Sequence, residues 1–210
     1  MRFVTQLLPL LTASPLPGRV VTVLNPKLAG KVIPEDLSVR DPEHYGFTNV
    51  ASHIAQMTTF FLENLAVRNP GRLSLAHIYP GLVMTDGTKN GRLPRWLKLL
   101  WQYVVAPIAQ YFAVPFEECG QRVVFITSSR FPARLSNPSG ITPPSDESVE
   151  VAISSDGVAG GGAYKVDWNG ETIPSNPTYE KAREQGLYEK VWSHTLKAFE
   201  DIEAGRVFTG

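Results

Sequence analysis

The sequence predicts an α/β fold in which a parallel sheet is covered by helices. Residues 19–24 form a short β-branched run of the kind found in buried parallel strands, and residues 72–79 form a second run. Between them, residues 47–68 carry apolar side chains at helical spacing. Strand, long helix and strand make a βαβ unit, whose strands run parallel and are joined by a right-handed crossover.

The first predicted element is a helix over residues 1–12. No Ser, Thr, Asp or Asn precedes it as a cap, so we expect the chain to begin inside an element. Its apolar side chains recur at helical spacing: Phe3, Val4, Leu7, Leu8, Leu10 and Leu11. Pro15 to Gly18 predict a turn, and Asn25 and Pro26 end the strand that follows.

The middle of the chain continues this pattern. Residues 26–44 hold several prolines and charges and predict an exposed loop. In the helix at 47–68 one apolar stripe consists of Ile54, Met57, Phe61 and Leu65. Asn69, Pro70 and Gly71 end this helix, and Pro80 and Gly81 end the second strand.

The remainder predicts less regular structure. A helix is expected at 115–128, a partly disordered loop rich in Pro, Ser and Gly at 131–161, and a third strand at 162–168. The tail at 177–204 is predicted to be helical, with Gly186 as a break. We expect one domain of 210 residues: core and lid at 1–130, the loop, and the last strand and C-terminal helices at 162–210.

Composition excludes several classes of partner. The 20 basic and 20 acidic residues cancel, so the sequence predicts neither a nucleic-acid-binding protein nor one that binds an anionic membrane. Charged residues interrupt the apolar run at 93–116, so no membrane span is expected. The single cysteine, Cys119, forms no internal disulfide, and no Cys/His spacing predicts a metal site. A reducing, cytoplasmic location is expected.

Several short motifs occur in a distinctive order. A Leu-Pro pair at Leu8 and Pro9 lies in the first helix. Tyr45 lies just before the long helix, and Asn49 lies in its first turn. Pro-Gly-x-x-x-Thr follows the second strand. This order, over residues 1–170, resembles the C-terminal half of a short-chain dehydrogenase/reductase, in particular divergent fungal-type members. The resemblance implies a partial Rossmann-like, doubly wound parallel sheet with helices on both faces.

The resemblance also suggests catalytic residues. Tyr45 occupies the place of the family's tyrosine, which exchanges a proton with the substrate oxygen, and Asn49 replaces the family's lysine. Because Asn49 is neutral, we expect Tyr45 to donate a hydrogen bond but to be a poor base at neutral pH. Asn25 approximates the place of the family's serine and is predicted to be an amide donor.

A nicotinamide cofactor, NAD or NADP, is implied by the resemblance alone. Pro80, Gly81 and Thr85 match the turn that contacts it in the family. The family's glycine-rich turn, whose backbone amides hold the pyrophosphate, has no counterpart in this sequence. The glycine run at 160–162 lies in the late loop and is interpreted as a flexible turn.

The aromatic segment at 93–116 is the candidate substrate-binding element. In the family this region closes over an apolar substrate, and its bulk here suggests a large hydrophobic ligand such as a polyketide or terpenoid of secondary metabolism. The residues assigned to the substrate are Trp96, Trp101 and Tyr103. The alternative is a helix that packs on the core or on a partner subunit.

Three functions remain open from the sequence. The first is an oxidoreductase that lacks its own nucleotide-binding half and acts on a hydrophobic small molecule. The second is a cofactor-independent isomerase, dehydratase or cyclase that uses Tyr45 as proton donor. The third is a non-catalytic partner that dimerises through the helices at 1–12 and 47–68, and a homodimer is expected on physical grounds, because a sheet edge and apolar helix faces are exposed without the first half.

Overall fold

The computed structural model describes residues 1–84, 94–135 and 149–210. The first part contains helix α1 (Arg2–Ala13), strand β1 (Gly18–Val23), the short 3-10 helix η1 (Pro26–Leu28), helix α2 (Phe47–Arg68) and strand β2 (Leu73–Ile78). The remainder contains α4 (Arg95–Leu100), the π-helical η2 (Trp101–Val105), α5 (Ala106–Ala109), α6 (Phe116–Phe125), β3 (Ala163–Val166), α7 (Pro177–Glu184) and α8 (Leu187–Glu203).

The three described strands form one parallel sheet in the order β1-β2-β3. Gly18 lies opposite Leu73 at one end of the β1–β2 pair, and Val23 lies opposite Ile78 at the other. The predicted βαβ unit is therefore confirmed, because α2 connects these two strands. Sequential parallel order with helical crossovers is the arrangement of a partial Rossmann-like fold.

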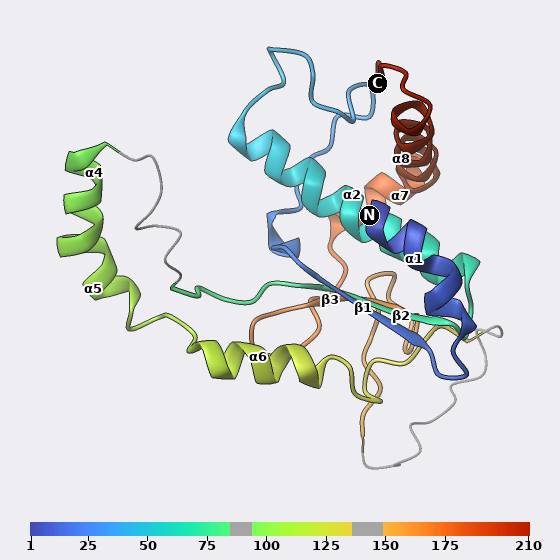
Figure 1. Ribbon diagram of the computed structural model, residues 1–210, viewed down its shortest axis with the longest axis horizontal. Coiled ribbons are helices and arrows are strands. Elements are labelled where there is room, and N and C mark those ends of the chain that lie inside the picture. The colour runs from blue at the N-terminus through green and yellow to red at the C-terminus, as the bar shows by residue number, and fades with distance from the viewer. Residues whose placement is uncertain (85–93, 136–148) are drawn as a thin grey trace.

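Helices cover both faces of the sheet, as predicted (Figure 1). Alternate residues of a strand point to opposite faces. In β2, Leu73 and Leu75 pack into a cluster with α2 and with side chains of α1 and α8, whereas Ala76 and Ile78 pack with Ile126 at the end of α6. Every residue of β2 is buried, because it is the central strand and both faces of the sheet are covered.

The C-terminal helices anchor the long helix α2. Phe61 of α2 stacks on Trp192 of α8 with ring centroids 5.2 Å apart, and Phe60 meets Tyr179 of α7 edge-on at 5.6 Å. Gly186 separates α7 from α8 with a φ of 70°, a left-handed conformation that glycine adopts at little cost. The predicted break at this glycine is confirmed.

The described parts of the late loop are more ordered than their composition predicts. Within the described parts of residues 131–161, Phe131 and Ala152 are buried in the core, and Arg134 pairs with Asp156 at 2.6 Å. The expectation of disorder also covered residues 136–148, which lie outside the described residues. The third strand is shorter than predicted because the chain turns at Asp167, whose backbone N–H donates to the Glu171 carbonyl at 2.8 Å.

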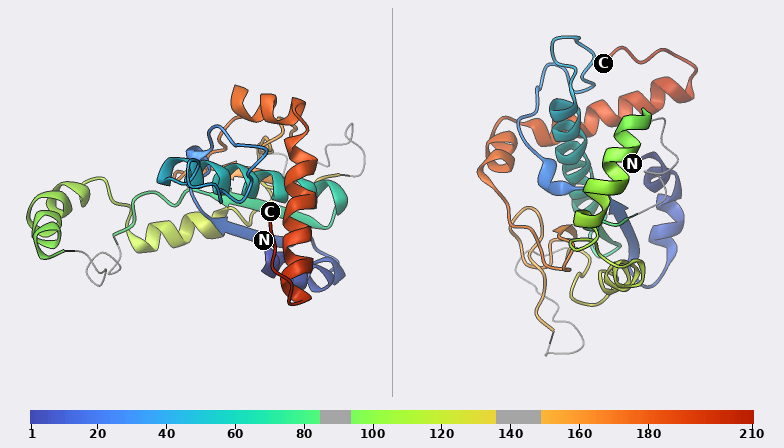
Figure 2. Two further views of the ribbon diagram at one scale, coloured as in Figure 1. Left: turned by 90° about the horizontal axis from the view of Figure 1, so that it is seen from above. Right: turned by 90° about the vertical axis from the view of Figure 1, so that its left-hand side faces the viewer.

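The aromatic segment α4-η2-α5 stands apart from the sheet and its covering helices (Figures 1 and 2). It joins the body where the Val114 N–H donates to the Leu82 carbonyl at 2.8 Å. Among the described residues, no helix is both long enough and apolar enough to span a membrane.

Candidate functional site

The carboxyl ends of the three strands meet at one edge of the sheet, where open α/β sheets bind their ligands. Asn25 follows β1, Tyr79 follows β2 and Asp167 follows β3. Lys27 of η1 forms an ion pair with Asp167, and its ammonium nitrogen lies 5.8 Å from the centre of the Tyr79 ring. This contact ties η1 to the ends of β2 and β3 and so fixes the chain that leaves β1.

A cavity of about 430 Å³ lies beside this edge. It brings together two of the predicted catalytic residues, Asn25 and Tyr45, from opposite ends of the loop between β1 and α2. Its remaining walls are largely apolar, and the full lining is Leu24, Asn25, Leu28, Tyr45, Gly46, Phe47, Val50, Ala51 and Ile54. Apolar walls with a few polar groups are typical of sites for apolar small molecules.

The loop that presents Tyr45 is held by one carboxylate. Asp36 accepts hydrogen bonds from the backbone N–H groups of Arg40 (2.9 Å) and Asp41 (3.0 Å) and contacts His44 Nδ1 at 3.0 Å. These hydrogen bonds, led by the two backbone donors, lower the pKa of Asp36 to about 2. Tyr45 itself is 74% exposed and directly precedes the start of α2.

Asn25 and Asn49 have different surroundings. Asn25 Oδ1 accepts a hydrogen bond from the Lys27 N–H at 2.9 Å and caps η1, which leaves its amide NH₂ as the donor group. Asn49 Nδ2 donates to the His44 carbonyl at 2.8 Å. Asn49 therefore ties the Tyr45 loop to α2, and it is absent from the described lining of the cavity.

The predicted cofactor turn is packed against this chain's own side chains. Gly81 has a φ of 82°, and a Cβ atom built there lies 2.7 Å from Val114 Cγ2 and 3.2 Å from Trp168 Cβ. Only glycine fits this turn after β2. Thr85, the third residue assigned to the cofactor, lies outside the described residues.

The glycine run at 160–162 is not the flexible turn that we expected. A Cβ atom at Gly162 would lie 2.7 Å from the Arg134 backbone nitrogen, so the turn is tightly packed. It also precedes β3, at the amino end of the strand, whereas ligands bind at the carboxyl ends. The described residues of this chain therefore do not fit the pyrophosphate of a nicotinamide dinucleotide.

The three aromatic residues assigned to the substrate lie on the projecting segment. Trp96 and Tyr103 are 67% and 70% exposed, and Trp101 is half-buried. None of them contributes to the described lining of the cavity of Asn25 and Tyr45. The structure therefore brings Asn25 and Tyr45 to one cavity, whereas the segment α4-η2-α5, which carries these aromatic residues, stands apart from the sheet (Figure 2).

Sequence reasoning missed a buried polar cluster between the sheet and helices α2 and α7. Thr59 Oγ1 lies 3.0 Å from His77 Nδ1 and 3.3 Å from the Tyr179 hydroxyl. Arg183 donates to Glu63 at 2.6 Å. The full cluster is Thr59, Glu63, His77, Lys165, Tyr179 and Arg183. The available signal was an ionisable residue within each of two short strands, His77 in β2 and Lys165 in β3.

Burial dominates the electrostatics of this cluster. Desolvation, with a smaller contribution from the Lys165 charge, lowers the pKa of His77 to about 4. Desolvation also lowers the pKa of Lys165 to about 8. Desolvation raises the pKa of Glu63, and the positive charge of Arg183 opposes that rise. Lys165 keeps partners even so: Nζ donates to the Pro174 carbonyl at 2.9 Å and lies 4.0 Å from the centre of the Tyr179 ring.

Comparison with known proteins finds fungal oxidoreductases as relatives of this chain. The chain is 36% identical over 203 residues to the short-chain dehydrogenase/reductase SAT2 of Stachybotrys chartarum, which covers 96% of this chain and 56% of that protein. It is 35% identical over 198 residues to the oxidoreductase AN1596 of Emericella nidulans (93% and 57%). It is also 33% identical over 208 residues to the NmrA-like family domain-containing oxidoreductase notO of an Aspergillus species (98% and 56%).

The chain thus spans little more than half the length of the curated relatives that it matches. No family model matches the chain, and no solved structure matches it. The parallel sheet, the order of the motifs and the relatives agree, and together they identify the chain as a partial relative of the fungal short-chain dehydrogenase/reductases that resembles their C-terminal half.

Proposed function

We propose that this chain carries the substrate-binding half of an oxidoreductase that acts on a hydrophobic small molecule with a carbonyl or hydroxyl group. The observation that carries the proposal is the cavity at the carboxyl end of β1, where Asn25 and Tyr45 supply polar groups among apolar walls. A volume of about 430 Å³ suits a small organic molecule. Both side chains line this cavity and carry a donor group, and we propose that the ligand oxygen accepts hydrogen bonds from both.

In this proposal Tyr45 acts as a hydrogen-bond donor to the ligand oxygen, and Asn25 supports it through its amide NH₂. The side chain of Asn49 is engaged with the His44 carbonyl and brings no positive charge to the tyrosine. An isomerase, dehydratase or cyclase that needs no cofactor, with Tyr45 as its proton donor, is the second candidate, and the neutral Asn49 in place of a lysine is compatible with it.

Tyr45→Phe tests the cavity. With progesterone, a rigid and largely apolar diketone, as the probe, we expect the variant to bind roughly two- to tenfold more weakly, because one hydrogen bond to a ketone oxygen is lost. Isothermal titration calorimetry gives both affinities. The matched control is Tyr111→Phe, which removes a hydroxyl from an exposed tyrosine of the projecting segment and leaves binding unchanged.

Two results contradict this assignment: equal affinities for the Tyr45→Phe and Tyr111→Phe chains, or no saturable binding of the ketone. A second variant, Ala51→Phe, adds a ring at the cavity wall. We expect it to weaken binding while the variant still unfolds cooperatively, which separates a blocked site from a damaged fold.

Nicotinamide chemistry, if the protein carries it out, needs a nucleotide-binding part beyond these residues. We therefore expect NADH not to bind with micromolar affinity to the 210-residue chain when its fluorescence is followed; weaker binding of its adenosine monophosphate unit elsewhere on the chain does not bear on this expectation. Micromolar affinity would contradict the proposal that the nucleotide-binding part lies outside these residues, because it would require a dinucleotide site that the glycine turns described above do not provide.

A homodimer is proposed as the assembly. Helix α1 has no buried residue, and its Phe3 and Leu10 are 80% and 73% exposed, which favours an association surface. The C-terminal part of α2 is covered by α8 of the same chain and is not free for a partner. The proposed dimer contact is therefore formed by α1 and the edge of β1. A monomeric mass in light scattering contradicts it.

A further inference from the structure

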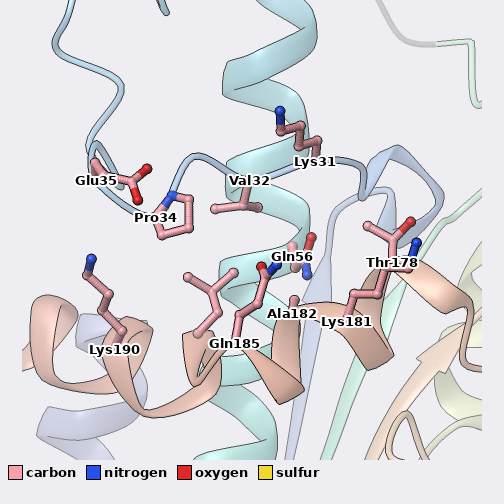
Figure 3. A pocket seen from close by; sticks show the side chains of 11 residues that line it. Lys31, Val32, Pro34, Glu35, Gln56, Thr178, Lys181, Ala182, Gln185 and Lys190 are labelled. Atoms are coloured by element: carbon pink, nitrogen blue, oxygen red, sulfur yellow. The ribbon is translucent and has the colours of Figure 1, made fainter.

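A second cavity, of about 720 Å³, lies on the side of α2 that faces α7 and α8 (Figure 3). It shares no lining residue with the cavity of Asn25 and Tyr45. Three segments build it: the loop before α2, the helix α2, and the helices α7 and α8 with the turn between them. Its lining is Lys31, Val32, Pro34, Glu35, Gln56, Thr178, Lys181, Ala182, Gln185, Leu187 and Lys190.

One side chain in this lining is unusual. Gln56 of α2 is 0% exposed, and neither its Oε1 nor its Nε2 has a hydrogen-bond partner among the described residues. A buried amide without partners is unfavourable, because it has lost its hydrogen bonds to water and gained none in the protein. An apolar side chain of similar shape would avoid this loss. A ligand that pairs with both atoms accounts for a glutamine at this position.

The rim of the same cavity is positively charged. Lys31 comes from the loop before α2, Lys181 from α7 and Lys190 from α8, against one carboxylate, Glu35. Within the described residues, none of these lysines forms an ion pair. The three lysines lie on different sides of the cavity (Figure 3), and together they make the potential around it attractive to an anion.

The start of helix α8 adds to this field. The helix has 17 residues, its N-cap is Gly186, and no side chain caps it. Its first backbone N–H groups and the positive end of its dipole lie next to Gln185 and Leu187 of the lining. The cavity therefore combines a positive rim with a buried amide that offers one donor and one acceptor.

We propose that this cavity binds a nucleoside monophosphate, with the phosphate at the start of α8, in the positive field of the rim lysines, and the base edge paired with Gln56. A nucleobase presents a hydrogen-bond donor and acceptor side by side, which a glutamine amide matches with two hydrogen bonds. Because Gln56 has no exposed surface, the base reaches it only when an exposed neighbour such as Gln185 moves aside. The site is independent of the proposed oxidoreductase function.

Titration calorimetry with AMP, GMP, CMP and UMP tests the proposal on the 210-residue chain. At least one nucleotide is expected to bind saturably with a Kd below roughly 1 mM, and more tightly than adenosine or inorganic phosphate alone, since each of these lacks one half of the contacts. Binding is expected to weaken as salt is added, because the lysines are exposed. If none of the four nucleotides saturates the chain, the proposal is overturned.

Gln56→Met separates a ligand-binding role from a structural one. The methionine has a similar shape and no polar amide, so we expect the melting temperature to rise while nucleotide affinity falls at least tenfold. A structural glutamine would show the reverse: a lower melting temperature with unchanged affinity. Unchanged affinity in this variant overturns the assignment of Gln56.

Charge reversal gives a second test that does not depend on a core substitution. Lys181→Glu combined with Lys190→Glu changes only exposed side chains, and we expect it to abolish nucleotide binding with little effect on the melting temperature. Lys98→Glu on α4 is the control, since this exposed lysine lies outside the cavity. Equal loss of binding in both would indicate nonspecific attraction and refute the site.

Discussion

Arg183→Met is expected to lower the free energy of unfolding by about 3–5 kcal/mol at neutral pH. Arg183 donates to Glu63 at 2.6 Å and to the Ser155 carbonyl at 3.1 Å, and the side chain of Glu63 is 4% exposed. Without the guanidinium, the buried carboxylate loses its ion-pair partner and must either stay ionised at a large cost or take up a proton. Urea unfolding, followed by tryptophan fluorescence, measures the loss.

Two controls show whether the buried charge causes this loss. Adding Glu63→Gln to Arg183→Met should restore part of the stability, because the amide carries no charge. Arg2→Met breaks the exposed Arg2–Glu203 pair, at 2.9 Å, and is expected to cost about 0–1 kcal/mol. A double variant less stable than Arg183→Met, or equal losses for Arg183→Met and Arg2→Met, would contradict the interpretation.

The Arg183→Met loss should also depend on pH. Burial raises the pKa of Glu63 in the folded protein, and removing Arg183 raises it further because the charge that lowers it is gone. At acid pH, where Glu63 is protonated in both proteins, the missing counter-charge matters less. The difference in stability between wild type and variant is therefore expected to shrink as the pH falls.

Protonation of His77 is expected to be the second large effect. Burial lowers the pKa of His77 to about 4 in the folded protein, against about 6.5 in the unfolded chain. Between these values the unfolded chain binds more protons than the folded protein, so stability falls as the pH falls. Over the whole interval this corresponds to about 3 kcal/mol, and above pH 6.5 the contribution to pH dependence vanishes.

His77→Gln isolates this effect, because glutamine can hydrogen-bond to Thr59 but does not titrate in this range. Urea unfolding at several values between pH 7 and pH 4.5 should show a steeper loss of stability for the wild type than for the variant. Glu63 and the other histidines remain in both proteins, so their contributions cancel in the difference. Parallel pH profiles would show that His77 does not titrate as its burial implies.

Local patterns in the sequence determined the secondary structure. The predicted helix over residues 47–68 matches α2 in both bounds, and the strands at 19–24 and 72–79 match β1 and β2 to within a residue at each end. These elements follow from apolar periodicity and from the prolines and glycines that end them, which are local properties. The family resemblance likewise followed from short motifs in order.

Only the tertiary structure decided which side chains meet. Asn25 and Tyr45 come from opposite ends of a loop, and the cavity between them depends on how the Asp36 carboxylate folds that loop. The buried polar cluster joins α2, two strands and α7, whose residues lie up to 120 positions apart. Such contacts leave no periodic signal, because an ionisable residue within a short strand does not reveal which side chain it will contact.

Gln56 makes the same point most clearly. In the sequence it is an ordinary helix residue, and helix propensity gives no reason to single it out. The packing of α7 and α8 against α2 buries its amide in the wall of a cavity that three lysines from other parts of the chain also line. The sequence alone thus determined the elements and their order, whereas burial, which arises only when the elements pack, determined where the unusual chemistry lies.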